Sequence, residues 1–522
     1  MMKSRSCLVV SLLLTLCDVI GLEAVPPADD DDPGFEDIFK TNTKSYENFH
    51  VQFNQPLPKW LRGILVRNGA GKLEMGSRKY LNYFDGYAKL HSWTFTGNGS
   101  AFFSAEMLMS KSFLSSERKN DIEPYLTFGG VNPPFDVAEK FAWMYFKMNN
   151  MNVNVFKYAN RTVAINDLWV SYEFDLQTLN TIGFRNPPVP PSKFWNIGKE
   201  VDMSSAHPVP EYGTSSRFEI ITTLSFIPGT KGRLGVVRIT SLDTTEMVAE
   251  WETEKSHYMH SFSVTPNYVI LFAAPYTVSI TKMLETCSVE GGMVWDGNAN
   301  TTIYIVEIKT GTLHTLQTEN VFVTHHINAF ELPDGRIVLD LPTQKNPFAF
   351  NYFDFSYIFN KTARMNIISM PILKRYTIDI HKKSVLKKTF KNGPKAPCAG
   401  ALELPVINEN YRHLNYCYIY GHVINYNGKG FSHMALVKKD VWDEAGDLMY
   451  AAPHQHFTEP WFVPNPLGKE EDDGVLMTSA FDGDMKQSYL AILDPKTMTL
   501  TNRAKMPTTV PFNFHGRFFN IP

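Results

Sequence analysis

Short apolar runs recur along nearly the whole of this 522-residue chain, and they constrain its fold more than any other feature. Turn pairs such as Asp334-Gly335 and Asn427-Gly428 separate them. Strands at this density, without helical periods between them, predict an all-β sandwich, barrel or propeller. The runs include Phe218 to Ile221, Leu234 to Ile239, Tyr268 to Phe272, Thr302 to Ile308, Arg336 to Leu341, Tyr416 to Tyr420 and Leu490 to Leu493.

Chain length favours the propeller among these folds. Several four-stranded blades take up about 300 to 400 residues at roughly 40 to 50 residues each. We find no fixed sequence period, so we expect degenerate blades. The segment Val137 to Lys147 is predicted to be helical and to cap one face. No linker divides the chain, and residues 46–522 are predicted to form one domain.

Composition excludes several classes of protein. A hydrophobic content of 43% and a charged content of 20% are typical of a globular chain rather than a disordered one. The net charge of -3 provides no basic surface for nucleic acid. Beyond the N-terminus, no segment approaches the roughly 18 uninterrupted apolar residues that a membrane span requires.

The first residues resemble a secretory signal. Lys3 and Arg5 precede the apolar run Leu8 to Leu16, which predicts a signal peptide over residues 1–21; a retained short anchor is the alternative. An acidic N-terminal extension, residues 22–45, follows it. We therefore expect the secretory pathway, with a mature protein that is secreted or held in the endoplasmic reticulum lumen. Four predicted N-glycosylation sites give this location mild support: Asn98, Asn160, Asn300 and Asn360.

Removal of the signal leaves three cysteines, Cys287, Cys398 and Cys417. Three cysteines permit at most one disulfide within the chain. Cys398 and Cys417 flank Glu403, but separation in sequence does not give the distance between their α-carbons. Whether these two residues pair stays open at this point.

Four histidines lie far apart in the sequence, each in a short apolar setting. Any one of them is more simply explained as an ordinary core or surface residue. An all-histidine iron site would nevertheless need four imidazoles delivered by separate parts of a rigid scaffold, and this spacing predicts a large closed fold. The four are His207 in SSAHP, His260 in YMHSF, His325 in THHINAFE and His515 in FHGRF.

Three acidic residues also lie in apolar settings: Asp167 in AINDLWV, Glu403 in ALELP and Glu459 in FTEPWFV. A carboxylate buried without a partner is strongly destabilising, so each needs a reason to be there. A metal-bound imidazole usually donates its remaining N–H to a carboxylate, which makes these residues candidate partners of the histidines. A buried salt bridge or an exposed strand end is the alternative for each.

These motifs resemble, in the same order, those of the carotenoid cleavage oxygenases, the family that includes the retinal pigment epithelium retinoid isomerohydrolase. The resemblance covers nearly the whole mature chain. No single motif is decisive, but eight in sequence leave little room for coincidence. They are LRGILVRNGAG (Leu61 to Gly71), YFDGYAKLHSWTF (Tyr83 to Phe95), SSAHP, YMHSFSVTPNYVILF, HHINAFELPDGRIVLDL, ALELPVIN, EEDDGVLMT and FNFHGRF.

The resemblance implies an all-β fold, a seven-bladed β-propeller with Fe2+ on its axis beneath a helical dome. The implied metal ligands are His207, His260, His325 and His515. Three of them would be oriented by carboxylates, namely His260 by Asp167, His325 by Glu403 and His515 by Glu459. His207 would have no carboxylate partner.

Asp167 departs from the family pattern, because members usually carry glutamate at the aligned position. Aspartate is shorter by one methylene, which withdraws its oxygens by about 1.5 Å. We therefore expect that a direct hydrogen bond to His260 requires a backbone shift or a bridging water. Iron is expected to be held less tightly as a result.

The implied activity is that of a non-haem iron dioxygenase. It would insert both atoms of O2 across one carbon–carbon double bond of a carotenoid or apocarotenoid and give two carbonyl products. Phe128 matches a position that lines the substrate tunnel in relatives, with ordinary core packing as the alternative. An aromatic stretch is predicted to contact a membrane or lipid carrier, unless it is buried in the core: Phe135, Phe141, Trp143, Tyr145 and Phe146.

Two other functions stay open. A retinyl-ester isomerohydrolase would use the same fold with iron as a Lewis acid. The region NPPFDVAEKF lacks the acylatable cysteine of that relative, however, so lipid anchoring there is not expected. A secreted carotenoid-binding protein without turnover is the second alternative. Neither the cleaved bond nor the oligomeric state follows from the sequence.

Overall fold

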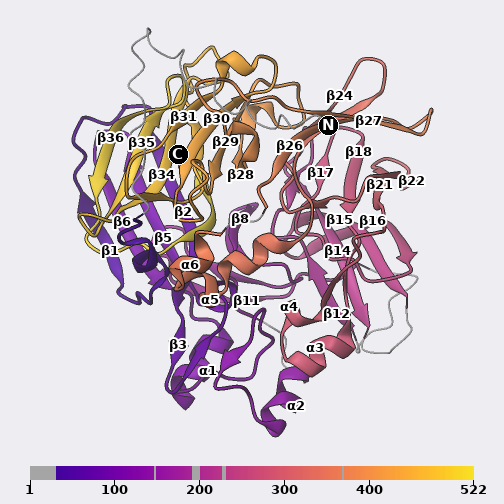
Figure 1. Cartoon of the computed structure of the whole chain (residues 1–522), viewed down its shortest axis with the longest axis horizontal. Coiled ribbons are helices and arrows are strands. Elements are labelled where there is room, and N and C mark those ends of the chain that lie inside the picture. The colour runs from indigo at the N-terminus through magenta and orange to yellow at the C-terminus, as the bar shows by residue number, and fades with distance from the viewer. Residues whose placement is uncertain (1–30, 146–148, 191–199, 226–230, 367–368, 522) are drawn as a thin grey trace, which may run out of the picture.

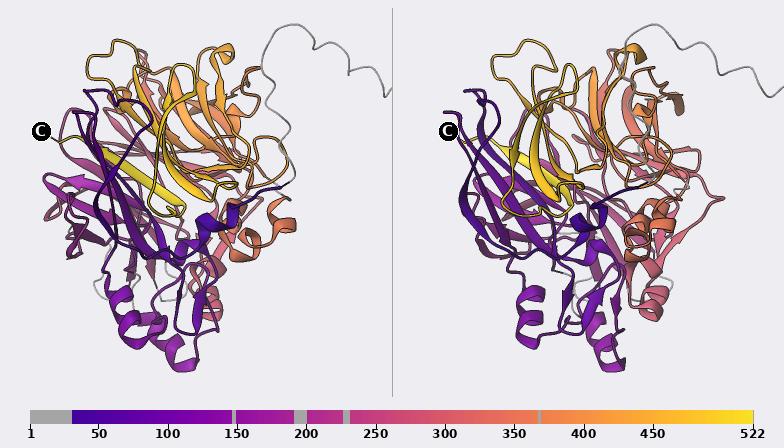
Figure 2. Two further views of the ribbon diagram at one scale, coloured as in Figure 1. Left: turned by 90° about the vertical axis from the view of Figure 1, so that its left-hand side faces the viewer. Right: turned by 60° about the vertical axis from the view of Figure 1, so that its left-hand side comes forward.

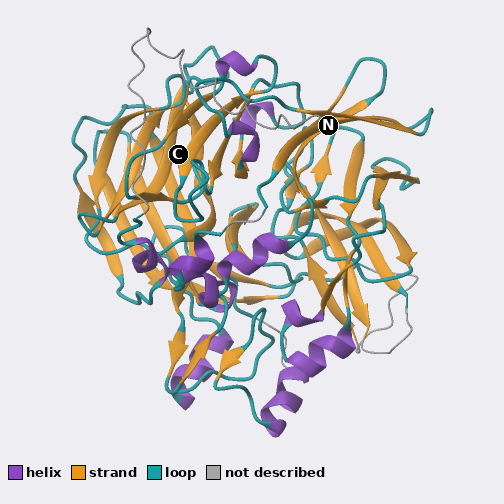
Figure 3. Ribbon diagram, viewed as in Figure 1, coloured by secondary structure: helices purple, strands orange, loops and turns teal. Residues whose placement is uncertain are grey.

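The computed structural model describes residues 31–145, 149–190, 200–225, 231–366 and 369–521. These residues form mostly antiparallel β-sheets, with short helices between some of the strands (Figure 3). The prediction of a mostly β chain is therefore confirmed. Within the described ranges, no helix has the length and apolar content that crossing a bilayer would require.

Seven of the sheets formed by the described residues have four or five strands, and we number these seven in chain order. Sheet 1 contains β1 (Tyr46–Val51), β6 (Ala101–Met107), β5 (Tyr87–Thr96), β2 (Arg62–Lys72) and β37 (Asn513–Phe519). Sheet 2 contains β11 (Thr181–Arg185), β10 (Ser171–Phe174), β9 (Arg161–Ile165) and β8 (Asn154–Tyr158). Sheet 3 contains β12 (Glu200–Ser204), β14 (Arg217–Ser225), β15 (Gly232–Ser241) and β16 (Thr244–Thr253), with β13 (Val209–Pro210) also paired to β14.

The remaining sheets follow the same meandering order. Sheet 4 contains β17 (Ser263–Val264), β18 (Tyr268–Ala273), β21 (Thr301–Glu307) and β22 (Leu313–Thr318). Sheet 5 contains β23 (Phe322–Val323), β25 (Ile337–Gln344), β26 (Ile372–Asp379) and β27 (Ser384–Thr389), with β24 (Asn328–Glu331) on β25. Sheet 6 contains β28 (Glu403–Val406), β29 (Tyr418–Val423), β30 (Ala435–Asp440) and β31 (Leu448–Tyr450). Sheet 7 contains β32 (Gln455–Phe457), β34 (Gly474–Asp482), β35 (Gln487–Asp494) and β36 (Thr499–Lys505), with β33 (Trp461–Pro464) on β34.

Sheet 1 joins the two ends of the chain. Strand β37, near the C-terminus, pairs with β2 near the N-terminus, and His515 lies opposite Asn68 in that pairing. Figure 1 shows the late yellow strands beside the early indigo ones. This pairing fixes β37, and therefore His515, against the rest of the fold.

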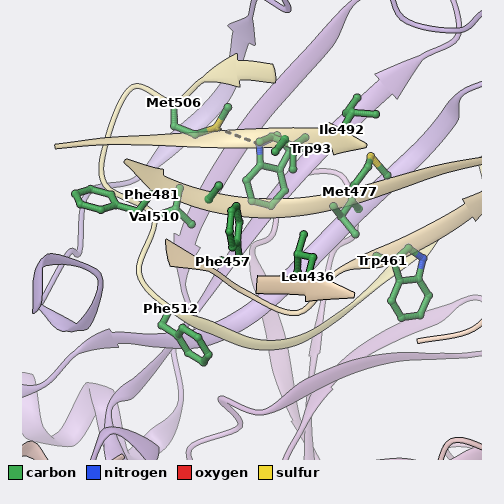
Figure 4. Packing of buried hydrophobic residues seen from close by; sticks show 14 of the residues in the cluster. Trp93, Leu436, Phe457, Trp461, Met477, Phe481, Ile492, Met506, Val510 and Phe512 are labelled. Carbon is green, nitrogen blue, oxygen red and sulfur yellow. Dashed lines mark hydrogen bonds between the residues drawn. The ribbon is translucent and has the colours of Figure 1, made fainter. Parts of the chain in front are cut away.

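Buried apolar side chains fill the space between consecutive sheets. One cluster joins sheets 4 and 5, where the rings of Phe272 and Tyr376 lie 5.1 Å apart. The largest cluster joins sheets 6 and 7 to sheet 1, and Figure 4 shows Trp93, Leu436 and Met477 among its members. Further clusters join sheets 1 and 2, 2 and 3, 3 and 4, and 5 and 6. Neighbouring sheets therefore pack face to face from the first to the last.

Most of the α-helices lie together at one end of the molecule (Figures 1 and 2). These are α1 (Lys111–Lys119), α2 (Val137–Tyr145), α3 (Ile280–Thr286) and α4 (Val289–Gly292), while α5 (Phe355–Ile358) and α6 (Lys361–Arg364) lie nearer the sheets. Helix α2 begins at the residue that the sequence predicted. The 3-10 helices are η1 (Phe35–Phe39), η2 (Tyr83–Asp85), η3 (Phe348–Phe353), η4 (Ala399–Ala401), η5 (Glu409–Tyr411) and η6 (Glu444–Gly446). Two small sheets, β3 (Glu74–Met75) with β4 (Arg78–Tyr80) and β7 (Val131–Asn132), and β19 (Tyr276–Val278) with β20 (Met293–Trp295), complete the fold.

The N-terminal boundary of the domain lies earlier than residue 46. Phe35 and Phe39 of η1 are fully buried in the largest apolar cluster. The neighbouring Asp32 forms a buried ion pair with Arg364 at 2.7 Å. The acidic composition of residues 22–45 predicts an extension. Phe35 and Phe39 within that segment nevertheless pack in the core.

The three cysteines among the described residues are all free. Cys287 is buried, whereas Cys398 and Cys417 are partly exposed. The Sγ atom of Cys398 lies 3.5 Å from the sulfur of Met449 rather than bonded to Cys417. The fold is therefore held by its sheets and their packing, without a disulfide among the described residues.

Candidate metal centre

The four predicted histidines converge at one point. Each lies on or beside an edge strand of a different sheet, which explains their wide spacing in the sequence. One ring nitrogen from each lies within 4.8 Å of those of the others. They are His207 between β12 and β13, His260 before β17, His325 between β23 and β24, and His515 on β37.

The imidazole rings face one another through their Nε2 atoms. Nε2 of His207 lies 3.0 Å from Nε2 of His260, and Nε2 of His325 lies 3.3 Å from Nε2 of His515. The plane of the His207 ring is inclined by 81° to that of His325 and by 85° to that of His515. Four nitrogen lone pairs can therefore point into one small space.

Burial keeps the imidazoles of His207 and His515 neutral. It holds the pKa of His207 well below the usual value, and the other three histidines lower it further. Burial also lowers the pKa of His515 to about 4, against the opposing effect of Glu459. Neutral imidazoles are ligands for iron, zinc, copper and nickel. Because converging lone pairs repel one another without a cation between them, this donor set fits a metal ion.

Three of the histidines use their other ring nitrogen to bond a carboxylate. Each distance is that of a hydrogen bond, with the Nδ1–H of the imidazole as donor. No such carboxylate bonds His207 among the described residues. The pairs are His325 Nδ1 with Glu403 Oε2 at 2.6 Å, His515 Nδ1 with Glu459 Oε1 at 2.7 Å, and His260 Nδ1 with Asp167 Oδ1 at 2.9 Å.

Asp167 reaches His260 directly, so no bridging water is required. Its loop follows β9 and is held against β12, where the Asp167 carbonyl accepts a hydrogen bond from the Ser204 N–H at 3.0 Å. The carboxylate also accepts from the backbone N–H of Ala206 at 3.0 Å and from the hydroxyl of Tyr258 at 2.8 Å. These contacts position the shorter side chain beside the imidazole.

The other two carboxylates also have partners that the sequence did not single out. Arg67 on β2 forms a buried ion pair with Glu459 at 2.6 Å. Gln344 at the end of β25 donates to Glu403 at 3.0 Å. The only sequence signal for Arg67 was a charged residue inside the apolar run LRGILVRNGAG. Gln344 gave no signal.

An apolar cavity opens at the histidine cluster. His260, His325 and His515 line it together with Tyr258. Its remaining wall is largely apolar, and much of it comes from the helical end of the molecule. These residues include Phe84, Leu126, Phe128, Met283, Val289 and Phe350.

Phe128 lies in this wall, where its ring centre is 5.4 Å from that of Phe84 and 5.7 Å from that of Phe350. It therefore lines the cavity and packs against other aromatic residues at the same time. Its backbone N–H is held by the buried carboxylate of Asp85 at 2.5 Å. The segment that carries Phe128 is thus fixed relative to the cavity.

The predicted membrane-contacting stretch is only partly described. Phe135 is 4% exposed and packs in an apolar cluster beneath the guanidinium of Arg78, so its assignment to an exposed patch was wrong. It precedes α2 and lies in one apolar cluster with Met75, Tyr80 and Val131 of the sheet formed by β3, β4 and β7. Val137, at the start of α2, is 73% exposed. The side chains of Phe141, Trp143 and Tyr145, and all of Phe146, lie outside the described residues.

The family of this chain can be assigned from its sequence profile. The profile of the family described as "Retinal pigment epithelial membrane protein" matches residues 39–520. This chain belongs to that family. The resemblance found in the eight sequence motifs is therefore confirmed.

Two curated relatives of this family member are named as dioxygenases. The chain is 25% identical to the β,β-carotene 15,15'-dioxygenase of Gallus gallus, over 92% of this chain and 98% of the relative. It is 27% identical to the mitochondrial carotenoid-cleaving dioxygenase of Mustela putorius furo, over 90% of this chain and 94% of the relative. The prediction of an oxygenase enzyme agrees with both names.

A solved structure shows that the fold is shared. The cobalt-substituted apocarotenoid oxygenase of Synechocystis aligns with a TM-score of 0.78 over 94% of this chain and 99% of that chain. The two sequences are 21% identical. Similar folds at this level of identity mean that the arrangement of sheets is retained although most side chains differ.

Proposed function

We propose that this protein is a non-haem iron dioxygenase that cleaves one carbon–carbon double bond of a carotenoid or apocarotenoid with O2, giving two carbonyl products. One observation carries this proposal. The four-imidazole cluster forms the end of an apolar, aromatic-lined cavity, so that a metal site and a polyene site share His260, His325 and His515. Both curated relatives described above are named as dioxygenases acting on such substrates.

We infer that the metal is Fe2+. Its ligands would be the four histidines of the cluster, all of them neutral donors. Bound Fe2+ would supply the activation of O2. The role of Asp167, Glu403 and Glu459 is to hold the donor nitrogens inward by accepting the Nδ1–H of three rings, which also fixes the tautomer.

We also infer that the seven sheets are the blades of a seven-bladed propeller whose axis passes through the histidine cluster, with the helical end as its dome. Three findings support this inference. Consecutive sheets pack on one another from the first to the last, β37 joins the last segment of the chain to β2, and edge strands of four sheets meet at the histidines. The fold is shared with an apocarotenoid oxygenase.

The cavity wall would select the substrate and the bond. A polyene has no polar handle along its length, so it must be held by shape and by contact with apolar and aromatic side chains. Phe84, Phe128 and Phe350 supply such contacts. If the polyene is held at one depth, the same double bond always lies beside the histidines. The reaction is then restricted to that bond.

We further propose membrane contact and secretion. An apolar substrate has to be taken from a membrane or lipid carrier, and the exposed Val137 at the start of α2 lies at the helical end that borders the cavity.

For secretion, the supporting feature is that all four predicted glycosylation sites are exposed: Asn98, Asn160, Asn300 and Asn360. Treatment of the expressed protein with an endoglycosidase would lower its mass if they carry glycans.

The decisive experiment is incubation of the iron-loaded protein with candidate carotenoids, apocarotenoids and retinyl esters under air and under nitrogen. Oxygen-dependent aldehyde or ketone products support the dioxygenase. Oxygen-independent retinol would instead support the isomerohydrolase, and pigment bound without change would support a carrier. The variant His325→Ala should lose iron and activity together. His257→Ala is the matched control, because His257 bonds the Ala274 carbonyl and lies outside the cluster.

A further inference from the structure

A second cavity, which we call the polar cavity, also reaches the histidine cluster. It has a volume of about 90 Å3, and His207, His325 and His515 line one part of it. Because His325 and His515 line the apolar cavity as well, the histidine cluster lies between the two. The side chains of Arg412 and Arg517 contribute to the wall of the polar cavity. The polar cavity therefore has guanidinium groups in its wall, which the apolar cavity lacks among the described residues.

Arg517 in the cavity wall, and Arg217, which lies over the same aromatic ring, each have a hydrogen-bond donor to spare. Arg517 lies over the rings of Phe156 and Trp461, at 4.4 and 5.3 Å from their centres. Arg217 lies over the same Phe156 ring at 5.4 Å. The buried Nε of Arg517 and the buried Nη1 of Arg217 have no hydrogen-bond partner among the described residues. Aromatic faces attract the cations but leave these in-plane N–H groups unpaired.

Glu409 supplies one negative charge to this group. It forms an ion pair with Arg412 at 2.6 Å. Burial alone would raise the pKa of Glu409, but Arg412, Arg517 and Arg217 lower it to about 2, so the carboxylate is ionised. Three arginines thus share one carboxylate.

Glu459 also lines the polar cavity, but both oxygens of its carboxylate are already paired with other side chains. Its Oε2 atom lies 2.6 Å from Nη1 of Arg67, which is not part of the cavity wall. Its Oε1 atom accepts the Nδ1–H of His515 at 2.7 Å. Among the described residues around the cavity, positive charge therefore exceeds negative charge.

We propose that the polar cavity binds a small monovalent anion, either a halide such as chloride or a short carboxylate such as formate, between Arg412 and Arg517. Buried charge is costly unless it is paired, and a bound anion would pair the excess. Guanidinium N–H groups form strong, charge-assisted hydrogen bonds to anions. The small volume excludes a large organic anion. The site depends on arginines rather than on the proposed reaction, so it would exist with or without catalytic turnover.

Thermal unfolding of the full chain tests this proposal in solution. The protein is compared in sodium chloride, sodium formate and sodium gluconate at equal ionic strength, because gluconate is too large for the cavity. An anion that binds only the folded state raises the unfolding midpoint in proportion to the logarithm of its concentration. We expect a rise of several degrees in chloride or formate relative to gluconate, and the salt with the larger rise identifies the preferred anion. Equal midpoints in all three salts would overturn the proposal.

Two variants separate this site from general salt effects. Arg517→Leu should abolish the difference between chloride and gluconate. Arg336→Leu should retain it, because Arg336 is an exposed turn residue that pairs with Asp334 at 2.8 Å. If Arg517→Leu still responds as the wild type does, the anion effect lies elsewhere and the proposal fails.

A crystallographic measurement on the wild type covers the case in which Arg517→Leu does not fold. Crystals soaked in sodium bromide should show an anomalous peak in the polar cavity, within contact distance of Arg412 and Arg517. Bromide found only at the protein surface would indicate an adventitious ion only and would contradict the assignment. Neither outcome depends on whether the protein cleaves carotenoids, so failure here leaves the proposed function untouched.

Discussion

Tyr258 donates its hydroxyl to Asp167, and the two oxygen atoms lie 2.8 Å apart. The same carboxylate accepts from Nδ1 of His260 at 2.9 Å and from the backbone N–H of Ala206 at 3.0 Å. Ala206 directly precedes His207. One short side chain therefore connects the two segments that carry two of the four predicted ligands.

Asp167→Ala is expected to lower iron retention by about 10- to 100-fold, because the carboxylates that orient metal-bound histidines contribute on this scale. Asp167→Glu keeps the charge and should retain iron as well as the wild type does. Iron content after dialysis against a graded series of chelator concentrations measures the effect. Asp175→Ala is the control, since Asp175 bonds Thr178 in a turn away from the cluster. Equal iron content in all four proteins would exclude a role for Asp167.

Tyr258→Phe removes one of the hydrogen bonds that hold Asp167 and leaves the ring in place. We expect a loss of about 1 kcal/mol in the free energy of unfolding and a smaller loss of iron than Asp167→Ala causes. Tyr276→Phe provides the comparison, because the Tyr276 ring is a neighbour whose hydroxyl forms no hydrogen bond to another described residue. Chemical denaturation of the two metal-free variants measures the difference. Identical stabilities would mean that the Tyr258 hydroxyl does not contribute.

Local patterns were enough to predict the strands. The runs Phe218 to Ile221 and Leu234 to Ile239 lie in β14 and β15, and Tyr268 to Phe272 lies in β18. Alternation of apolar and polar residues and a high content of β-branched residues predict each strand from a segment of a few residues. No information about distant parts of the chain is required. The four histidines could likewise be selected because each is embedded in its own motif.

The partners of the site could not be predicted in the same way. Arg67 and Glu459 are separated by 392 positions, and Asp167 and Tyr258 by 91. Nothing in either segment specifies the other, because only the assembled sheets bring them together. The burial of Phe135 depends in the same manner on packing beneath Arg78, which an aromatic-rich pattern does not reveal.

Glu290→Gln should stabilise the protein at pH 8 more than at pH 5. Burial, together with Asp354 and Asp85, raises the pKa of Glu290 from 4.5 to about 7. A carboxyl group with a raised pKa binds its proton more tightly in the folded state, so the wild type loses stability as the pH rises from about 4.5 to about 7. The amide that replaces this carboxyl group does not ionise, so the variant should be free of this loss.

The gain expected for Glu290→Gln at pH 8 is at most about 3.5 kcal/mol, since one pKa unit corresponds to about 1.4 kcal/mol. The amide oxygen can still accept from Asn351, which bonds Glu290 at 2.9 Å. Unfolding midpoints at the two pH values give the measurement. Glu285→Gln on the neighbouring helix α3 is the control, because the Glu285 side chain is exposed. A pH-independent effect of Glu290→Gln would refute the assigned pKa shift.

Arg67→Met should destabilise the protein strongly. Arg67 and Glu459 form a buried ion pair with side-chain exposures of 2% and 6%. Removing the guanidinium leaves the carboxylate buried beside His515 without its cation, and the expected cost is about 3 to 5 kcal/mol. Denaturant unfolding of the metal-free protein measures it. The exposed pair of Arg336 and Asp334 provides the comparison, and Arg336→Leu should change stability little.

The double variant Arg67→Met with Glu459→Gln distinguishes lost charge pairing from lost packing. If the penalty of Arg67→Met comes from the unpaired carboxylate, neutralising Glu459 should recover much of the lost stability. Iron retention should not recover in parallel, because a glutamine at this position would no longer present a negative charge to Nδ1 of His515. A double variant as unstable as Arg67→Met alone would show that the arginine acts through packing of its side chain.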